Sequence, residues 1–327
     1  SFADRSGRSI CLRPEFTASI VRLYASGRSQ LATPARLHYS GPAFRYEKPT
    51  GGTYRQFTES GVELIGVDGS AADAEVIELA TASLTQLGIP QFDVVLGHLG
   101  ILSEFLIDLG LSERSESLLR EGMTSLRRSN PDVGPLRAKL EQSNHNRNAD
   151  PLKPAAEQLD EIFERVPNLG QEDVRQIIAT ALAGIEMTPS GSRPYSEIVD
   201  GLLAKVTRSN EAERISRALD FIERLTTVVD RPNSAFKKTR SLLADFGLSS
   251  APLDHVEDMF VELDAAGVDT SHFYFNPALG RGLQYYSDTV FEIFAPDATS
   301  GVQICGGGRY DDLVEILSGP PSTPAVG

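Results

Sequence analysis

The pattern of hydrophobic residues changes twice along this chain of 327 residues. Residues 1–112 and 251–327 mix short strand patterns with helices, whereas residues 113–250 repeat apolar positions every three to four residues and show almost no strand pattern. Strands on both sides of a helical block predict one α+β core, an antiparallel sheet flanked by helices, with a helical insertion. We therefore expect the first part of the core over 1–112, the insertion over 113–250 and the second part over 251–327.

A hairpin is the clearest local prediction. Residues 35–49 and 53–67 have strand patterns and are joined by a loop that contains proline and two glycines. Helices are expected over 15–26 and 70–88, where apolar residues recur with helical spacing. Further strands are expected over 8–14, 91–100, 271–277, 283–296 and 301–308.

Charge and composition argue against several classes of protein: general nucleic-acid binders, metalloproteins and membrane proteins. Acidic residues outnumber basic ones by 45 to 31, for a net charge of −14. General nucleic-acid binding depends on Lys and Arg that neutralise phosphates, so this balance argues against it without excluding a local basic site. The five scattered histidines show no ligand spacing, so no metal site is expected. The chain has no apolar run of about 18 residues and no signal peptide, and we expect a cytoplasmic protein that does not contact a membrane.

Charged side chains gather on the predicted hairpin. Alternate residues of a strand share a face, so Glu59, Gly61 and Glu63 lie on one face. If the two strands pair, Arg45 can reach Glu59 or Glu63. A ring of surface ion pairs, each worth about 0–1 kcal/mol, is one explanation. The other is a pocket for a small zwitterion, in which carboxylates hold an ammonium and a ring N–H and an arginine holds a carboxylate; a nucleotide would also fit such a set.

The segment CGGGRYDDL, at 305–313, places three glycines before Arg309. Glycine permits a tight turn or the close approach of a ligand, and both explanations stay open. The segment lacks the Lys-Ser/Thr ending of a P-loop.

Four segments, in this order, resemble the catalytic core of class II histidyl-tRNA synthetases and their paralogues. They are LRPEFT at 12–17, FRYEKPTGGTYRQF at 44–57, GRGLQYYSDTVFE at 280–292 and GGGRYDDLVE at 306–315. The resemblance implies an antiparallel sheet of six or seven strands flanked by helices, and a homodimer. The closing PAVG resembles the start of the family's last motif, and the family's first helix and strand are not recognised, so we expect both ends of the chain to be truncated.

The resemblance also implies a histidine-binding pocket, with the glycines at 306–308 as its floor. Its residues would be Glu15, Phe16, Thr17, Arg45, Glu59, Glu63, Arg281, Tyr285, Tyr286 and Tyr310. In a synthetase, which uses ATP and Mg²⁺, Arg45 would contact an ATP phosphate and Arg281 would assist the attack of the histidine carboxylate.

Departures from the synthetase pattern distinguish two members of the family. Phe16 stands where the synthetases have glycine, Thr53 replaces a loop arginine, Glu59 replaces a glutamine and Gln284 replaces an aspartate. These features resemble the paralogue that regulates ATP phosphoribosyltransferase, the first enzyme of histidine biosynthesis. We therefore predict a histidine-sensing regulatory subunit that has no catalytic residues and no cofactor and that binds the short-form catalytic subunit of that enzyme.

The alternative is a histidyl-tRNA synthetase core that forms histidyl-adenylate and charges tRNA(His). Arg45 and Arg281 are both retained, which keeps this alternative open.

Overall fold

The computed structural model describes residues 2–27, 31–46, 54–111, 115–119, 122, 133–145, 213–280, 285–295 and 302–327. Thr53, Arg281, Gln284 and most of the predicted insertion lie outside these ranges. The described residues fall into two compact units. The first, here called the sheet unit, contains those up to Glu104 and from Arg224 onward; the second, the helical unit, contains those from Phe105 to Glu223.

The predicted hairpin is confirmed in the sheet unit. Strand β3 (Ala35–Phe44) pairs antiparallel with β4 (Gln56–Ile65), in a register that places Tyr39 opposite Gly61. The short strand β9 (Ala325–Val326) joins the other edge of β4. Alternation along β3 and β4 therefore sends one set of side chains to each face, as the sequence pattern indicates.

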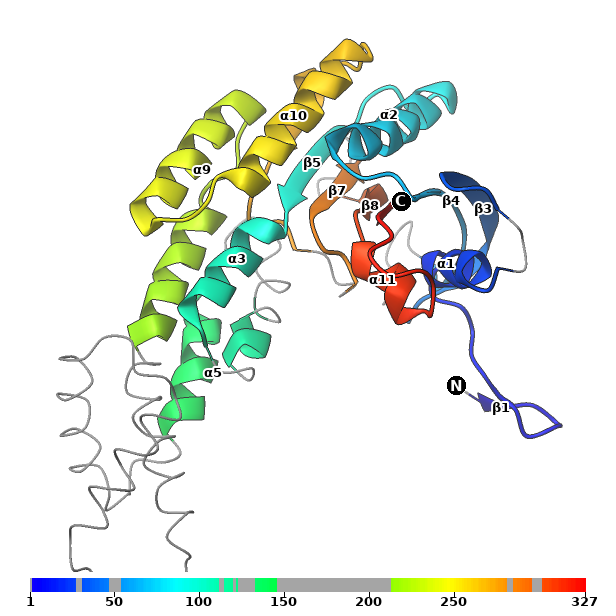
Figure 1. Ribbon diagram of the computed structural model, residues 1–327, viewed down its shortest axis with the longest axis horizontal. Helices are drawn as coiled ribbons and strands as arrows, with labels where there is room; N and C mark the ends of the chain where they lie inside the picture. Colours follow the sequence, from blue (N-terminus) through cyan, green and yellow to red (C-terminus); the bar gives the residue numbers. More distant parts are fainter. Residues whose placement is uncertain are drawn as a thin grey trace, which may run out of the picture. The chain divides into compact units, whose positions relative to one another are not determined.

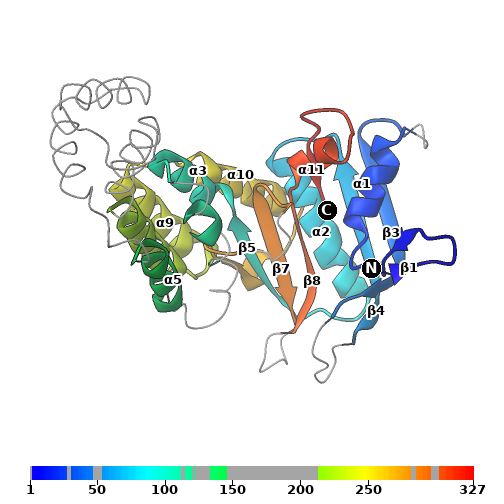
Figure 2. The same cartoon turned by 90° about the horizontal axis from the view of Figure 1, so that it is seen from below.

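A second sheet of the same unit has the strand order β6-β5-β7-β8 among the described residues, and Figure 2 shows β5, β7 and β8 side by side. Its pairs are antiparallel except for β5 with β6, which are parallel. The predicted antiparallel sheet is therefore confirmed with one parallel pair added. The two sheets meet where Gly308 and Gly327 exchange backbone hydrogen bonds of 2.9 and 3.2 Å. The strands are β5 (Asp93–His98), β6 (Phe273–Phe275), β7 (Thr289–Phe294) and β8 (Gln303–Gly308).

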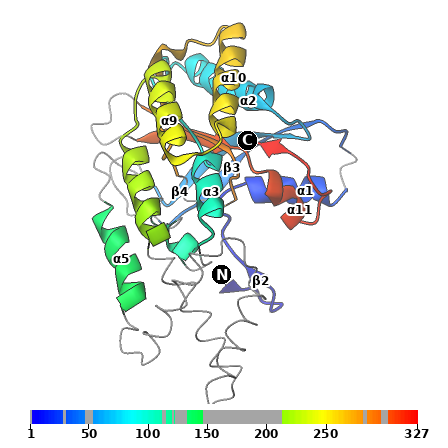
Figure 3. The same cartoon turned by 60° about the vertical axis from the view of Figure 1, so that its left-hand side comes forward.

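Helices cover the sheets. Helices α2 and α10 lie side by side, as do α1 and α11, which are almost 300 residues apart in the chain (Figures 1 and 3). Helix α2 begins after Gly69 and ends shortly before Gly88, and both glycines have positive φ angles. The bounds are α1 (Thr17–Ala25), α2 (Ser70–Gln86), α9 (Pro232–Phe246), α10 (Ala251–Ala265), the 3-10 turn η1 (Thr270–His272) and α11 (Asp311–Ile316).

The strand predicted over 8–14 is much shorter than expected. Only Ser9–Ile10 (β2) is extended and paired, with Phe2–Ala3 (β1). Pro14 lacks a backbone N–H and cannot donate to a sheet, and no strand of the described residues pairs with Cys11 or Leu12.

The helical unit packs around aromatic and aliphatic side chains. Phe105 and Phe221 are fully buried, with ring centroids 4.2 Å apart. Helix α3 (Gly100–Leu109) contributes Phe105, helix α5 (Gly134–His145) contributes Leu136 and Leu140, and a helix over 213–226 contributes Phe221. None of the described helices is both long and apolar enough to span a membrane.

One buried cluster connects the sheets to the predicted site. Val21, Ala35, Ile65, Leu313, Val314 and Ala325 surround Tyr310, whose side chain is itself only 1 % exposed. Tyr285 and Tyr286 are partly buried and pack against this cluster. The tyrosines of the predicted pocket are thus held by the hydrophobic core of the sheet unit.

Candidate functional site

Glu63 is a buried carboxylate with one unused acceptor. Its side chain is 1 % exposed, and the Tyr310 hydroxyl donates a hydrogen bond to Oε2. Oε1 has no hydrogen-bond partner among the described residues. Burial raises the pKa of Glu63 to about 7, against the opposing effect of the Tyr310 and Thr17 hydroxyls. Since a buried, unpaired acceptor is costly, this oxygen is suited to a ligand that brings an N–H or O–H donor.

Tyr39 is a pocket residue that the sequence analysis did not identify. A Cβ atom built on Gly61 would lie 2.3 Å from the Tyr39 hydroxyl, so the tyrosine side chain lies directly over the glycine of the opposite strand. Burial, together with the negative charges of Glu63 and Glu59, raises the pKa of Tyr39. The alternation and the register of the hairpin were the signals that could have placed Tyr39 beside these carboxylates.

Phe16 lies next to Tyr39, over strand β3. Its ring stacks on that of Tyr39, with centroids 4.9 Å apart and planes 12° apart, and the Arg13 guanidinium lies 4.1 Å from the centre of the ring. A Cβ atom on Gly41 would come within 2.8 Å of Phe16 Cζ. Phe16 is therefore buried against the backbone of β3, beside the Tyr39 ring.

Glu15 and Thr17 come from the turn that starts α1. The Glu15 carboxylate accepts hydrogen bonds of 3.1 and 3.3 Å from the Ala18 N–H, a favourable arrangement at a helix N-terminus. Thr17 is 9 % exposed, and its hydroxyl is near those of Tyr39 and Tyr285. Glu15 also adds to the negative charge that raises the pKa of Glu63.

Arg45 contacts Glu59, one of the two partners expected from the sequence. Its Nη2 lies 2.8 Å from Glu59 Oε2, and its Nε donates to the Pro14 carbonyl at 3.1 Å. The guanidinium also lies 5.0 Å from the centre of the Phe57 ring. Arg45 thus joins the hairpin to the segment before α1 at the more exposed end of the pocket.

Three tyrosines close the other side. The ring centroids of Tyr285 and Tyr286 are 4.7 Å apart, and those of Tyr285 and Tyr310 are 5.9 Å apart at 82°. Burial raises the pKa of Tyr285 and Tyr310. A Cβ atom on Gly308 would lie 2.9 Å from Tyr286 Cδ1 and 2.5 Å from the Thr289 carbonyl oxygen, so this glycine allows the tyrosine to pack on β8.

The structure therefore gathers the predicted pocket residues around Glu63, apart from Arg281, which lies outside the described residues. We call this cluster the Glu63 pocket. It combines acidic groups, one arginine and aromatic walls, which is the chemistry expected for a small zwitterion.

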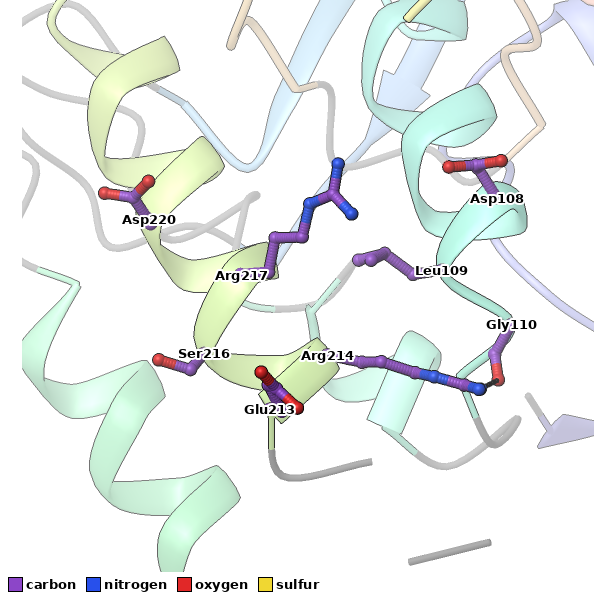
Figure 4. A pocket seen from close by; sticks show the side chains of 8 residues that line it. All are labelled: Asp108, Leu109, Gly110, Glu213, Arg214, Ser216, Arg217 and Asp220. Carbon is purple, nitrogen blue, oxygen red and sulfur yellow. Dashed lines mark hydrogen bonds between the residues drawn. The ribbon is translucent and has the colours of Figure 1, made fainter. Parts of the chain in front are cut away.

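A separate cavity of about 700 Å³ lies within the helical unit (Figure 4). Within it, Arg214 donates a hydrogen bond of 3.1 Å to the Gly110 carbonyl. Its lining mixes acidic and basic side chains and includes no predicted site residue: Asp108, Leu109, Gly110, Glu213, Arg214, Ser216, Arg217 and Asp220.

Solved structures support the fold. A crystal structure described as an ATP phosphoribosyltransferase regulatory subunit/histidyl-tRNA synthetase from Bacillus halodurans aligns with a TM-score of 0.61 and 22% identity over 99% of this chain and 64% of that one. The histidyl-tRNA synthetase of Nostoc sp. PCC 7120 aligns with a TM-score of 0.51 and 19% identity over 96% of this chain and 56% of that one. At these identities the likeness concerns the fold alone.

Sequence relatives point to one family. The histidine–tRNA ligase of Methanocaldococcus jannaschii is 31% identical over 328 residues, which cover 100% of this chain and 58% of that protein. The ligase of Thermococcus kodakarensis is 30% identical over 327 residues, again 100% and 58%. The chain therefore spans a little over half the length of these relatives. The family model described as histidyl-tRNA synthetase matches residues 1–160 and 175–327, and the chain accordingly belongs to the histidyl-tRNA synthetase family.

Proposed function

We propose that this chain is the histidine-activating core of a histidine–tRNA ligase. The unused acceptor of Glu63 is the observation that carries the proposal. Histidine offers an imidazole N–H for Glu63 Oε1 and an ammonium group for the carboxylates of Glu15 and Glu59. Hydrogen bonds to a charged acceptor in a dry site are among the stronger ones, so a ring N–H would be well held.

The relatives favour this activity over the regulatory role that the sequence pattern favoured. Those compared above by sequence are named histidine–tRNA ligases. In the reaction, a carboxylate oxygen of histidine would attack the α-phosphorus of ATP and pyrophosphate would leave, giving histidyl-adenylate. Arg45 lies beside the pocket and is a cation that can hold a negatively charged oxygen of ATP or histidine. The histidyl group would then pass to tRNA(His), with the protein acting as a cytoplasmic homodimer.

Mg²⁺ would enter with ATP. The described residues contain no group of three His, Cys, Asp or Glu side chains placed to hold a metal ion. Mg²⁺ commonly keeps several waters and binds substrate phosphates with only one or two carboxylates, so such a group is not required.

A histidine-sensing regulatory subunit is the second candidate. Two observations favour it: Arg45 is already paired with Glu59, and Phe16 fills the space above Gly41. In this role the pocket would bind histidine without chemistry, and the partner would be a short-form ATP phosphoribosyltransferase. Histidine would inhibit only if it bound one assembly state more tightly than another.

Pyrophosphate exchange separates the two. With the full-length protein, ATP and histidine, a ligase incorporates labelled pyrophosphate into ATP only when histidine is present. Absence of exchange, together with intact histidine binding and a changed turnover of an added short-form ATP phosphoribosyltransferase, would reject the ligase and favour the regulator.

A further inference from the structure

Arg309 is a buried arginine outside the Glu63 pocket. Its side chain is 2 % exposed, and it follows the last residue of β8. Its backbone is fixed from both sides, because its N–H donates to the Thr289 carbonyl at 2.8 Å and its carbonyl accepts from the Ser287 N–H at 2.9 Å.

All five N–H groups of this guanidinium have acceptors. Nε and Nη2 donate to Asp73 Oδ1 at 3.0 and 2.6 Å, and Nη2 also donates to the Gly69 carbonyl at 3.1 Å. Nη1 donates to the Val67 carbonyl at 3.4 Å and to Asp311 Oδ1 at 3.2 Å. An arginine with every donor in use is poorly suited to bind a ligand and well suited to hold protein segments together.

Asp73, on α2, is shared with a histidine. Its Oδ2 lies 2.8 Å from Nε2 of His255 on α10, and Asp73 itself is fully buried. The hydrogen bond to Asp73 raises the pKa of His255, whereas burial lowers the pKa of the neighbouring His98 to about 4. Two further charged groups act on both imidazoles: Asp288, which precedes β7, raises their pKa values, and Arg309 lowers them.

This cluster is connected to the pocket through one backbone segment. Tyr310 follows Arg309, and its N–H donates to the Ala325 carbonyl at 2.8 Å, while Asp311 accepts from the Ala325 N–H at 2.9 Å. Arg309 reaches α2, whereas the Tyr310 hydroxyl reaches Glu63 on β4. The same short segment is therefore anchored to α2 by one side chain and forms the pocket with the next.

We propose that Arg309, held by Asp73, whose other carboxylate oxygen is held by His255, is a positioning residue that fixes the Tyr310 hydroxyl against the Glu63 carboxylate. The pKa of Glu63 is lowered by the Tyr310 and Thr17 hydroxyls and raised by the charges of Glu15, at the start of α1, and Glu59, on its own strand. The charge of Glu63 in turn raises the pKa of Tyr39 on β3. The Tyr310 hydroxyl donates a hydrogen bond to Oε2 of the carboxylate, and its effect on the pKa of Glu63 is larger than that of the Thr17 hydroxyl. Losing that bond removes a donor that stabilises the charged form, so the pKa of Glu63 must rise.

The test is the pKa of Glu63 in the ligand-free protein, followed by ¹³C NMR of its carboxyl carbon, with Glu63→Gln to assign the signal. Arg309→Lys keeps the positive charge but cannot reach all the acceptors, so a direct charge effect stays small. We expect a midpoint near 7 in the wild type and a higher one in Arg309→Lys and in Tyr310→Phe. Arg309→Lys should add no further shift in the Tyr310→Phe background, because both changes act through one hydroxyl.

Arg36→Lys is the matched control. Arg36, on β3, makes a bidentate pair at 2.6 and 2.7 Å with Glu75 on α2, the helix that also carries Asp73, but this pair lies on the surface. Arg36→Lys should therefore leave the midpoint of Glu63 unchanged. If Arg309→Lys does not fold, His255→Leu replaces it; we expect a smaller upward shift that His255→Gln, which keeps an N–H donor, reverses. An unchanged midpoint in the folded variant, or a shift of equal size in the Tyr310→Phe background, overturns the proposal.

One consequence of this proposal rests on the proposed function: Arg309→Lys should bind histidine about tenfold more weakly than the wild type. A wild-type protein that binds no histidine would reject the function, whereas the ligand-free NMR titration would still decide the role of Arg309.

Discussion

Replacing Glu63 with glutamine should remove a pH-dependent loss of stability. The pKa of Glu63 is raised from 4.5 to about 7 in the folded protein, so its stabilising contribution is complete below pH 4.5 and is lost as the pH rises through 7. One pKa unit corresponds to about 1.4 kcal/mol, which puts the full penalty of the buried charge at about 3 kcal/mol. Glutamine keeps an acceptor for the Tyr310 hydroxyl and carries no charge.

Urea unfolding of the wild type and Glu63→Gln from pH 5.5 to 8.5 measures this effect. The free energy of unfolding of the variant, relative to the wild type, should increase by about 2 kcal/mol over that range. Glu75→Gln is the control: the hydrogen bond from Arg36 lowers the pKa of Glu75 from 4.5, so both folded and unfolded states are ionised above pH 5.5 and its difference from the wild type should not change with pH over this range. A difference between Glu63→Gln and the wild type that does not change with pH would refute the reasoning.

Three further substitutions test the packing of the hairpin. Gly61→Ala places a Cβ 2.3 Å from the Tyr39 hydroxyl and should cost about 1–3 kcal/mol in urea unfolding; an unchanged midpoint would contradict it. Glu59→Gln breaks an exposed pair with Arg45 and should cost no more than about 1 kcal/mol, so a loss above about 2 kcal/mol would show that the pair is structural. Ile65→Ala empties a fully buried site and should cost about 2–5 kcal/mol; thermal unfolding with a loss below about 1 kcal/mol would count against the core described here.

Much of the hairpin and part of the site could be predicted from alternation alone. Two strands joined by a glycine loop have few possible registers, so the sequence reduced the partners of Arg45 to Glu59 or Glu63, and the observed register selects Glu59. Tyr39 was missed because no unusual residue marks it; only its pairing with Gly61 brings it into the pocket.

Other features depend on distant parts of the chain. The parallel pair of β5 with β6 joins residues 93–98 to 273–275, and no local pattern specifies such a partner. Gly69 occupies the N-cap position of α2, and its carbonyl also accepts a hydrogen bond from Arg309, far along the chain. The contacts of Arg309 with α2 likewise span more than 230 residues, so its sequence neighbours, three glycines, gave no indication of them.

Titration calorimetry with free histidine at pH 8 tests the central claim most directly, because at that pH Glu63 is charged and its Oε1 is available. We predict that the wild type binds histidine and that Glu63→Gln binds it about 10- to 150-fold more weakly, the equivalent of about 1.5–3 kcal/mol for a hydrogen bond to a charged group. Equal affinities in the two proteins, or no binding by the wild type, would contradict the assignment of the Glu63 pocket to histidine.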